Sequence, residues 1–264
     1  MTLRVSLIGY GAIGRPVADA IAGGEVPGVE LGGVVTRTAG VATERGHREL
    51  SLDAALDTSD LMVECAGIPA AAELGPRVVA SGTDLLLVSM GVLADEPLRS
   101  ALLTGGPGRT FLTAGAIGGL DLLASVAANG GLTSASLTTA KSASSLVQPW
   151  MHSSVVAQLR EGTDARTVFE GPVSEAIEKF PASLNVAVAL AAATGMWEQT
   201  RVRLVADPRA ELTTHRVQAS GPAGEYDFTT RNYPLESNPR TSGAVPAAVV
   251  RALRAFTQAS GTFL

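Results

Sequence analysis

The hydrophobic pattern changes its period within the first 22 residues. Residues 3–8 are apolar apart from Arg4 and Ser6, and two of them, Val5 and Ile8, are β-branched, which is typical of a buried strand. From Ala12 to Ala22 the apolar residues recur at helical spacing. A glycine-rich segment, Gly9-Tyr10-Gly11-Ala12-Ile13-Gly14, lies between them. The pattern therefore predicts a strand, a glycine turn and a helix, in that order.

This turn has the spacing G-x-G-x-x-G, which between a strand and a helix is the fingerprint of a dinucleotide site. The first glycine permits the tight turn, the second lets a pyrophosphate approach the backbone, and the third lets the helix pack closely on the strand. The free N–H groups and the positive end of the helix dipole then face the phosphates. We therefore expect the cofactor to contact Gly9, Gly11, Ala12, Ile13 and Gly14.

Strands and helices continue to alternate as far as residue 112. Strands are expected at 29–35, 47–50, 61–65, 85–89 and 110–112, and helices at 52–56, from Pro69 onward and at about 94–103. Such alternation implies an α/β domain with a Rossmann-type, doubly wound parallel sheet. We assign residues 1–112 to a dinucleotide-binding domain.

The rhythm changes after residue 112. A glycine-rich segment at 113–121 opens a helix that ends near residue 128. Strands are expected at 133–139, 167–170, 201–206, 215–220 and 225–231, and helices at 172–180 and 184–193. Strands in close succession favour a largely antiparallel sheet, so we expect a second, α+β domain over residues 113–242 that binds the substrate. The tail, 243–264, contains an apolar helix at 245–256 that we expect to return to the first domain.

The end of the second strand bears on the choice of cofactor. NAD-binding versions of the motif carry an Asp or Glu there, which binds the ribose 2′-hydroxyl. This chain has Thr36 and Arg37 instead. Arg37 either pairs with a 2′-phosphate or is an ordinary surface arginine. The expected cofactor is therefore NAD or NADP, and we predict that NADP is accepted, alone or together with NAD.

Cys65 and Ala66 follow the strand at 61–65, at the carboxyl edge of the sheet where ligands bind. Both are expected at the cofactor site, although Cys65 could equally belong to the core. No base or helix dipole is aimed at Cys65 that would make it a nucleophile. As the only cysteine in the chain, it excludes an internal disulfide and a cysteine-based metal cluster, and no metal is expected.

Composition and charge narrow the class of protein. Hydrophobic residues make up 46% of the 264 residues and charged residues 17%, which suits a globular core. The net charge is −5 without a basic cluster, so nucleic acid is not an expected partner. No apolar segment is long enough to predict a membrane span. Because the first strand begins at Leu3, we expect no signal peptide and a cytoplasmic location.

Several segments together resemble the L-aspartate dehydrogenase family. The most specific are residues 115–121, Gly-Ala-Ile-Gly-Gly-Leu-Asp, and residues 180–186, Phe-Pro-Ala-x-x-Asn-Val. The resemblance also includes residues 9–14, 89–95, 171–176, 206–208 and 238–242.

The resemblance implies oxidative deamination of L-aspartate to iminoaspartate, or the reverse reaction, with a nicotinamide cofactor. It also implies a homodimer. His215 matches the catalytic histidine of the family, and a histidine that titrates near neutrality suits both the amine and the imine steps. The nicotinamide-side contacts match Ala116, Gly119 and Asn185, and Asn185 is also expected to contact the substrate. Because the substrate has two carboxylates, we expect Lys141 to pair with one of them, although it could be a solvated lysine.

The other two histidines have weaker claims to the site. His47 is expected at the surface, and His152 follows a loop at 149–151. Three segments near the expected substrate pocket also depart from the family pattern: 113–116, Ser183 and 142–145. Two alternatives therefore stay open: a related dehydrogenase or imine reductase for another small acid, or a catalytically idle dinucleotide-binding protein. His215 together with Asn185 argues against the idle protein.

Overall fold

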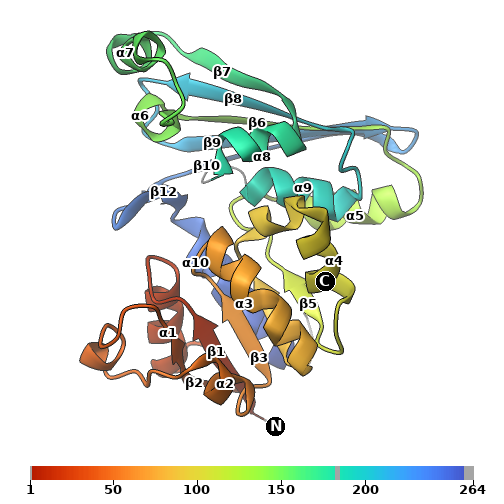
Figure 1. The fold of residues 1–264 in the computed structure, drawn as a ribbon. Coiled ribbons are helices and arrows are strands. Elements are labelled where there is room, and N and C mark those ends of the chain that lie inside the picture. Colours follow the sequence, from red (N-terminus) through yellow and green to blue (C-terminus); the bar gives the residue numbers. More distant parts are fainter. Residues whose placement is uncertain (1, 182–184, 259–264) are drawn as a thin grey trace. The chain divides into compact units, whose positions relative to one another are not determined.

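The computed structural model describes residues 2–181 and 185–258, and the chain divides into two compact units (Figure 1). Unit 1 contains the chain up to Thr113 and the chain from Val245 onward, and unit 2 contains Ala114–Ala244. Each unit has its own sheet and is described by itself.

The sheet of unit 1 is parallel throughout. Its strands are β1 (Leu3–Ile8), β2 (Val29–Val35), β3 (Leu61–Glu64), β4 (Asp84–Leu87) and β5 (Thr110–Leu112). They are arranged in the order β2-β1-β3-β4-β5, and each neighbouring pair is parallel. This order confirms the Rossmann-type doubly wound sheet.

The strand expected at 47–50 is not present, and this prediction is wrong. Only Glu49 forms an isolated bridge, to Val34 of β2. The side chain of Glu49 instead accepts hydrogen bonds from the backbone N–H groups of Gly40 and Ala42, at 2.9 and 2.8 Å. Two backbone hydrogen bonds, from Val34 N–H to the oxygen of Arg48 at 2.8 Å and from Leu50 N–H to the oxygen of Val34 at 2.9 Å, join the segment to β2, so it adds a single bridge and not a full strand.

Helices pack on this sheet and cover its apolar residues. They are α1 (Gly14–Ala22), α2 (Leu52–Leu56), α3 (Ile68–Ser81), α4 (Glu96–Thr104) and α10 (Ala244–Thr257), with short 3₁₀ helices η1 (Thr43–Arg45) and η2 (Met90–Ala94). Val17 of α1 and Leu253 of α10 belong to one buried cluster with Val5 and Leu7 of β1. The tail helix thus completes the core of unit 1, although it follows unit 2 in the sequence.

Replacement of Leu253 by alanine tests this packing. Leu253 has no exposed surface, so Leu253→Ala should lower the free energy of unfolding by about 2–5 kcal/mol, the usual cost of emptying a buried leucine site. Urea denaturation measures the loss. Leu103→Ala is the matched control, because Leu103 is 40% exposed on α4. Equal losses in the two variants would contradict the buried position of α10.

The sheet of unit 2 is mixed. Its strands are β6 (Ser134–Ser142), β7 (Arg166–Pro172), β8 (Thr200–Asp207), β9 (Thr213–Gly221) and β10 (Gly224–Asn232), in the order β10-β9-β6-β8-β7. Only the β6–β8 pair is parallel, and the other three pairs are antiparallel. This confirms the α+β class and the largely antiparallel sheet. A further pair, β11 (Pro234–Leu235) and β12 (Asn238–Ser242), is antiparallel as well.

Five helices of unit 2 are described: α5 (Leu120–Ala128), α6 (Ala143–Leu146), α7 (Ser153–Glu161), α8 (Val173–Lys179) and α9 (Asn185–Thr194). Helix α9 is buried on most of its surface and packs against α5, β6 and β8. The start of this helix was expected at Leu184, which lies outside the described residues. Of the helices in the described part of the chain, none is both long and apolar enough to cross a membrane.

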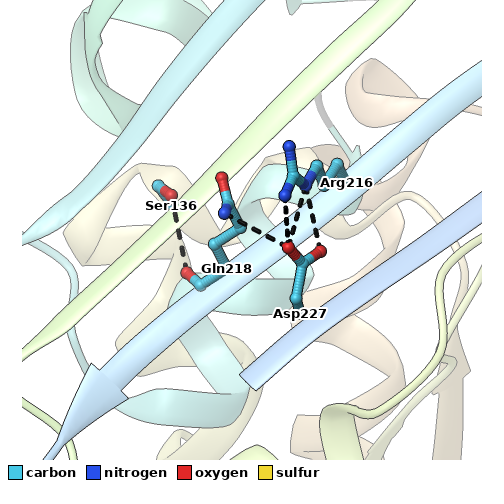
Figure 2. Close-up of polar contacts among 4 residues, drawn as sticks. All are labelled: Ser136, Arg216, Gln218 and Asp227. Carbon is cyan, nitrogen blue, oxygen red and sulfur yellow. Dashed lines mark hydrogen bonds and ion pairs between the residues drawn. The ribbon is translucent and has the colours of Figure 1, made fainter. Parts of the chain in front are cut away.

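The strands of unit 2 alternate between an apolar face and a polar face. On the polar face the guanidinium of Arg216 donates to Asp227 of the neighbouring strand, with Nε 3.0 Å from each carboxylate oxygen. Gln218 also donates to Asp227, and the hydroxyl of Ser136 donates to the backbone oxygen of Gln218 (Figure 2). These contacts join β6, β9 and β10 and support the register that aligns the opposite, buried face.

Candidate functional site

The glycine turn of unit 1 has the geometry that a dinucleotide site requires. Gly9 has a φ of +102°, which side-chain-bearing residues rarely adopt, and a Cβ there would lie 2.8 Å from Cα of Ala66. A Cβ on Gly14 would lie 2.2 Å from the carbonyl oxygen of Gly9. A Cβ on Gly11 would meet nothing within 4 Å, so this part of the turn faces open space. No side chain caps α1, so its first N–H groups can bind phosphate.

The segment after β2 emerges beside this turn. Ile8 pairs with Val35 at the ends of β1 and β2, and the N–H of Gly9 donates to the oxygen of Val35 at 2.9 Å. Arg37 follows two residues later and is exposed. Within the described residues its guanidinium takes part in no ion pair, so it is available to bind a phosphate. A role for Arg37 at the cofactor stays a prediction.

A buried carboxylate that the sequence analysis did not single out lies at the end of β3. Glu64 has no exposed surface. Its Oε1 accepts hydrogen bonds from the N–H groups of Ala66 and Gly67 and from the Ser89 hydroxyl, at 2.8, 3.0 and 3.0 Å. Its Oε2 accepts the Ser89 N–H at 2.9 Å. Glu64 thus joins the loop after β3 to the loop after β4, at the carboxyl edge of the sheet.

Burial raises the pKa of Glu64, and the hydrogen bonds from Ser89, Ala66 and Gly67 oppose that shift. All four hydrogen bonds are donated to the carboxyl oxygens, so they stabilise the ionised form, whereas burial stabilises the neutral form. Nothing in the local sequence distinguishes Glu64 from a surface glutamate, because two of its four hydrogen bonds come from Ser89, which lies 25 residues later in the loop after β4.

The thiol of Cys65 belongs to the core beneath the glycine turn. Its Sγ lies 3.4 Å from the oxygen of Ile8, to which the thiol donates, and 3.1 Å from the Cβ position of Gly14. Burial, with a contribution from Glu64, raises the pKa of the thiol well above its usual range. Cys65 is therefore not a nucleophile. Contacts of Cys65 and Ala66 with the cofactor stay predictions.

In unit 2, the glycine-rich segment is bound to strand β10. Its residue Ala116 accepts hydrogen bonds through its backbone oxygen from Thr230 and Asn232, at 3.0 and 2.9 Å. Gly119 has a φ of +80°, and a Cβ there would lie 2.7 Å from the ring of Phe228. Packing therefore explains the glycine at 119, and a cofactor contact by Ala116 or Gly119 stays a prediction.

His215 lies on β9 and pairs directly with Thr139 of β6. The Nδ1 atom of His215 is 2.9 Å from Oγ1 of Thr139, within hydrogen-bond distance. Lys141 is two residues further along β6, on the same buried face. All three side chains are buried: Thr139 has no exposed surface, and His215 and Lys141 are each 6% exposed. The register of the sheet thus brings two of the expected site residues, His215 and Lys141, to one face.

Burial lowers the pKa of His215 to about 4, and the charge of Lys141 contributes to the shift. The imidazole is therefore neutral at neutral pH, and the expectation of a histidine titrating near neutrality is wrong for this structure. A neutral imidazole has one N–H and one lone pair. With Nδ1 bonded to Thr139, Nε2 is the nitrogen left for a substrate.

Four other residues were considered for the site or its surroundings: Asn185, Ser183, His152 and His47. Asn185 is exposed at the first described position of α9, and its contacts with cofactor and substrate stay predictions. Ser183 lies outside the described residues. His152 caps α7, since its Nδ1 accepts the N–H of Ser154. His47 is not a solvated surface residue as expected: its side chain is only 9% exposed, and its Nε2 lies 3.0 Å from Asp19.

Sequence reasoning missed Thr139, although one signal was present. The segment 133–139 alternates apolar and polar residues, and Thr139 falls at a position of the apolar set, where a hydroxyl needs a hydrogen-bond partner. The identity of that partner depends on which strand lies alongside, which no local pattern specifies.

Comparisons with known proteins cover both units. The family model described as "Aspartate dehydrogenase, C-terminal" matches residues 121–256, and the model described as "Homoserine dehydrogenase, NAD binding domain" matches residues 9–105. An L-aspartate dehydrogenase of Serratia proteamaculans is 35% identical, with 95% of this chain and 96% of that protein covered. One from Pseudomonas aeruginosa is 36% identical over the same shares.

Among solved structures, the aspartate dehydrogenase of Thermotoga maritima has a similar fold. Its TM-score is 0.74 at 25% sequence identity, and 100% of each chain is covered. The similarity therefore extends over the whole length of both units and is not limited to the nucleotide-binding turn. This chain belongs to the L-aspartate dehydrogenase family.

Proposed function

We propose that this chain catalyses the NAD(P)-dependent oxidative deamination of L-aspartate to iminoaspartate, or the reverse reductive amination. Hydrolysis of the iminoaspartate would release oxaloacetate and ammonia. The observation that carries the proposal is the buried His215, bonded to Thr139 and close to Lys141, in a chain related over its whole length to L-aspartate dehydrogenases. An idle binding protein has no need of a buried histidine beside a buried lysine.

The residues of the chain divide the chemistry among them. A nicotinamide cofactor, when bound, would supply the acceptor for the hydride of the substrate Cα. The amine nitrogen loses a proton as the C=N bond forms, and Nε2 of the neutral His215 accepts it. The ammonium of Lys141 pairs with a substrate carboxylate. Because burial disfavours a charged His215, the imidazolium readily gives its proton up again, which suits addition of water to the imine.

Absorbance at 340 nm tests the reaction. The purified chain is mixed with L-aspartate and each oxidised cofactor, and separately with oxaloacetate, ammonia and each reduced cofactor. We expect turnover in both directions. If only another small amino or keto acid reacts, the chain is a related dehydrogenase with a different substrate. If none reacts while a reduced cofactor still binds, the chain is an idle dinucleotide-binding protein.

The cofactor proposal is that NADP is accepted, alone or together with NAD. Thr36 stands where an acid would bind the 2′-hydroxyl, and the exposed Arg37 follows it. Arg37→Ala should weaken NADP binding by about 1–3 kcal/mol, the range for a hydrogen bond to a charged group, and leave NAD binding little changed. Fluorescence titration with each reduced cofactor measures both affinities.

Arg77→Ala is the control for this experiment, because Arg77 is an exposed arginine of unit 1 that pairs with Asp53. It should change neither affinity. An equal loss for both cofactors in Arg37→Ala, or no loss for either, would contradict a contact between Arg37 and a 2′-phosphate.

The proposal also includes a cytoplasmic homodimer. The support for a dimer is the family resemblance, and light scattering of the purified chain measures its mass in solution. A monomer of 26.9 kDa would contradict it.

A further inference from the structure

The hydroxyl of Thr139 is held against His215 by the central strands of the unit 2 sheet. β6 and β9 are hydrogen-bonded neighbours, and Thr139 and His215 are directly paired residues. The Oγ1–Nδ1 distance is 2.9 Å, and both side chains are buried. Two strands inside a five-stranded sheet define this contact more rigidly than a loop would.

The direction of this hydrogen bond decides what His215 can do. If the Nδ1–H donates to Thr139, the lone pair lies on Nε2, and His215 can accept a proton from a substrate. If the Thr139 hydroxyl donates to Nδ1, the hydrogen lies on Nε2, and His215 can only donate a hydrogen bond, for example to a substrate carboxylate. Because burial keeps the imidazole neutral, one of these two tautomers is present.

We propose that Thr139 is a positioning residue that accepts the Nδ1–H of His215 and thereby leaves the lone pair on Nε2. This inference rests on the proposed function, in which Nε2 takes the amine proton. Of the two directions, only acceptance by Thr139 leaves Nε2 able to do so. The neighbouring Lys141 lies on the same face of β6, and its ammonium has no lone pair with which to accept the Nδ1–H in place of Thr139.

Two substitutions at one position separate the hydroxyl from the shape of the side chain. Thr139→Val keeps the shape and removes the hydroxyl, whereas Thr139→Ser keeps the hydroxyl. Thr139→Val should lower kcat by about 10- to 100-fold, as loss of a group that orients a functional histidine does elsewhere. Its KM for aspartate and its affinity for cofactor should be nearly unchanged. Thr139→Ser should restore most of the turnover.

Thr138→Val is the matched control, because Thr138 is the adjacent residue on the opposite face of β6. It should turn over like the wild type. A loss in Thr138→Val as large as that in Thr139→Val would attribute the effect to the strand as a whole and would overturn the proposal.

Nitrogen-15 NMR of the histidine rings reads the tautomer directly, on the wild-type chain. The chain has three histidines, and the resonances lost in His215→Asn identify those of His215. We expect Nδ1 to be protonated in the wild type and in Thr139→Ser, and the proton to move to Nε2 in Thr139→Val. A wild-type His215 protonated on Nε2 would overturn the proposal, even if Thr139→Val failed to fold.

Different variants test the role of His215 and the role of Thr139. If His215→Ala keeps its turnover, the proposed role of His215 is wrong, and the positioning role of Thr139 falls with it. If His215→Ala loses turnover but a folded Thr139→Val does not, the proposed function stands and only the role of Thr139 is overturned.

Discussion

Replacing His215 by alanine is expected to lower kcat by about 10²–10⁴, the usual worth of a positioned acid–base group. The imidazole is neutral and bonded through Nδ1 to Thr139, so its loss removes the proton acceptor without removing a charge. Binding of cofactor should be unchanged, because the glycine turn that is expected to hold the phosphates belongs to unit 1. Steady-state kinetics and cofactor titration of the folded variant measure both effects.

The pH dependence of this effect follows from the low pKa of His215. With a pKa of about 4, the imidazole is a competent base throughout the range above that value and is protonated only below it. The kcat/KM of the wild type should therefore fall as the pH drops through about 4, and His215→Ala should lack this limb. A limb near pH 6.5 in the wild type would show that the imidazole is less buried in solution than in the structure.

A different outcome would assign His215 another role. If His215 only orients a substrate carboxylate, His215→Ala should raise KM and lower kcat much less. His215→Asn, which keeps a side-chain hydrogen-bond donor, should then recover most of the loss. Near wild-type turnover in His215→Ala would remove the residue from the mechanism and direct attention to His152.

Replacing Glu64 by alanine is expected to lower the free energy of unfolding by at least about 1–3 kcal/mol, the cost of leaving one buried donor without its hydrogen-bond acceptor. The substitution deprives two N–H groups of the loop after β3, together with the N–H and hydroxyl of Ser89, of their acceptor. Buried donors without partners are costly, and Glu64 and Ser89 are both buried. Urea denaturation followed by circular dichroism measures the change.

Two controls separate this effect from the mere loss of a glutamate. Glu64→Gln should cost less than Glu64→Ala. With its oxygen at the position of Oε1 the amide still accepts three hydrogen bonds, and its NH₂ group then faces a donor only at the Ser89 N–H. Glu49→Ala removes a glutamate that also accepts backbone N–H groups but lies nearer to solvent, where water can replace it. If Glu49→Ala cost as much as Glu64→Ala, burial would not be the reason for the effect.

The nucleotide-binding turn could be predicted from the sequence because its requirements are local. Gly9 needs its positive φ and Gly14 must avoid the carbonyl oxygen of Gly9, both within the turn itself, and the change from strand to helix period is visible in consecutive residues. Most strands and helices were predicted for the same reason. Helix α7 was not, because its amphipathic pattern is short and its cap is a histidine, His152. The strand at 47–50 was predicted wrongly because the segment pairs with β2 only at Glu49, which no local pattern specifies.

The sequence by itself thus determined most of the order of elements, the two-sheet class and the presence of a dinucleotide turn. The tertiary structure alone decided which side chains meet. The hydrogen bond between Thr139 and His215 depends on the register of two strands far apart in the chain, and that register is determined by the packing of a whole sheet face. The charge states of His215 and Glu64 depend on burial, because the free energy of a charge is set by the atoms that surround it in space and not by its neighbours along the chain.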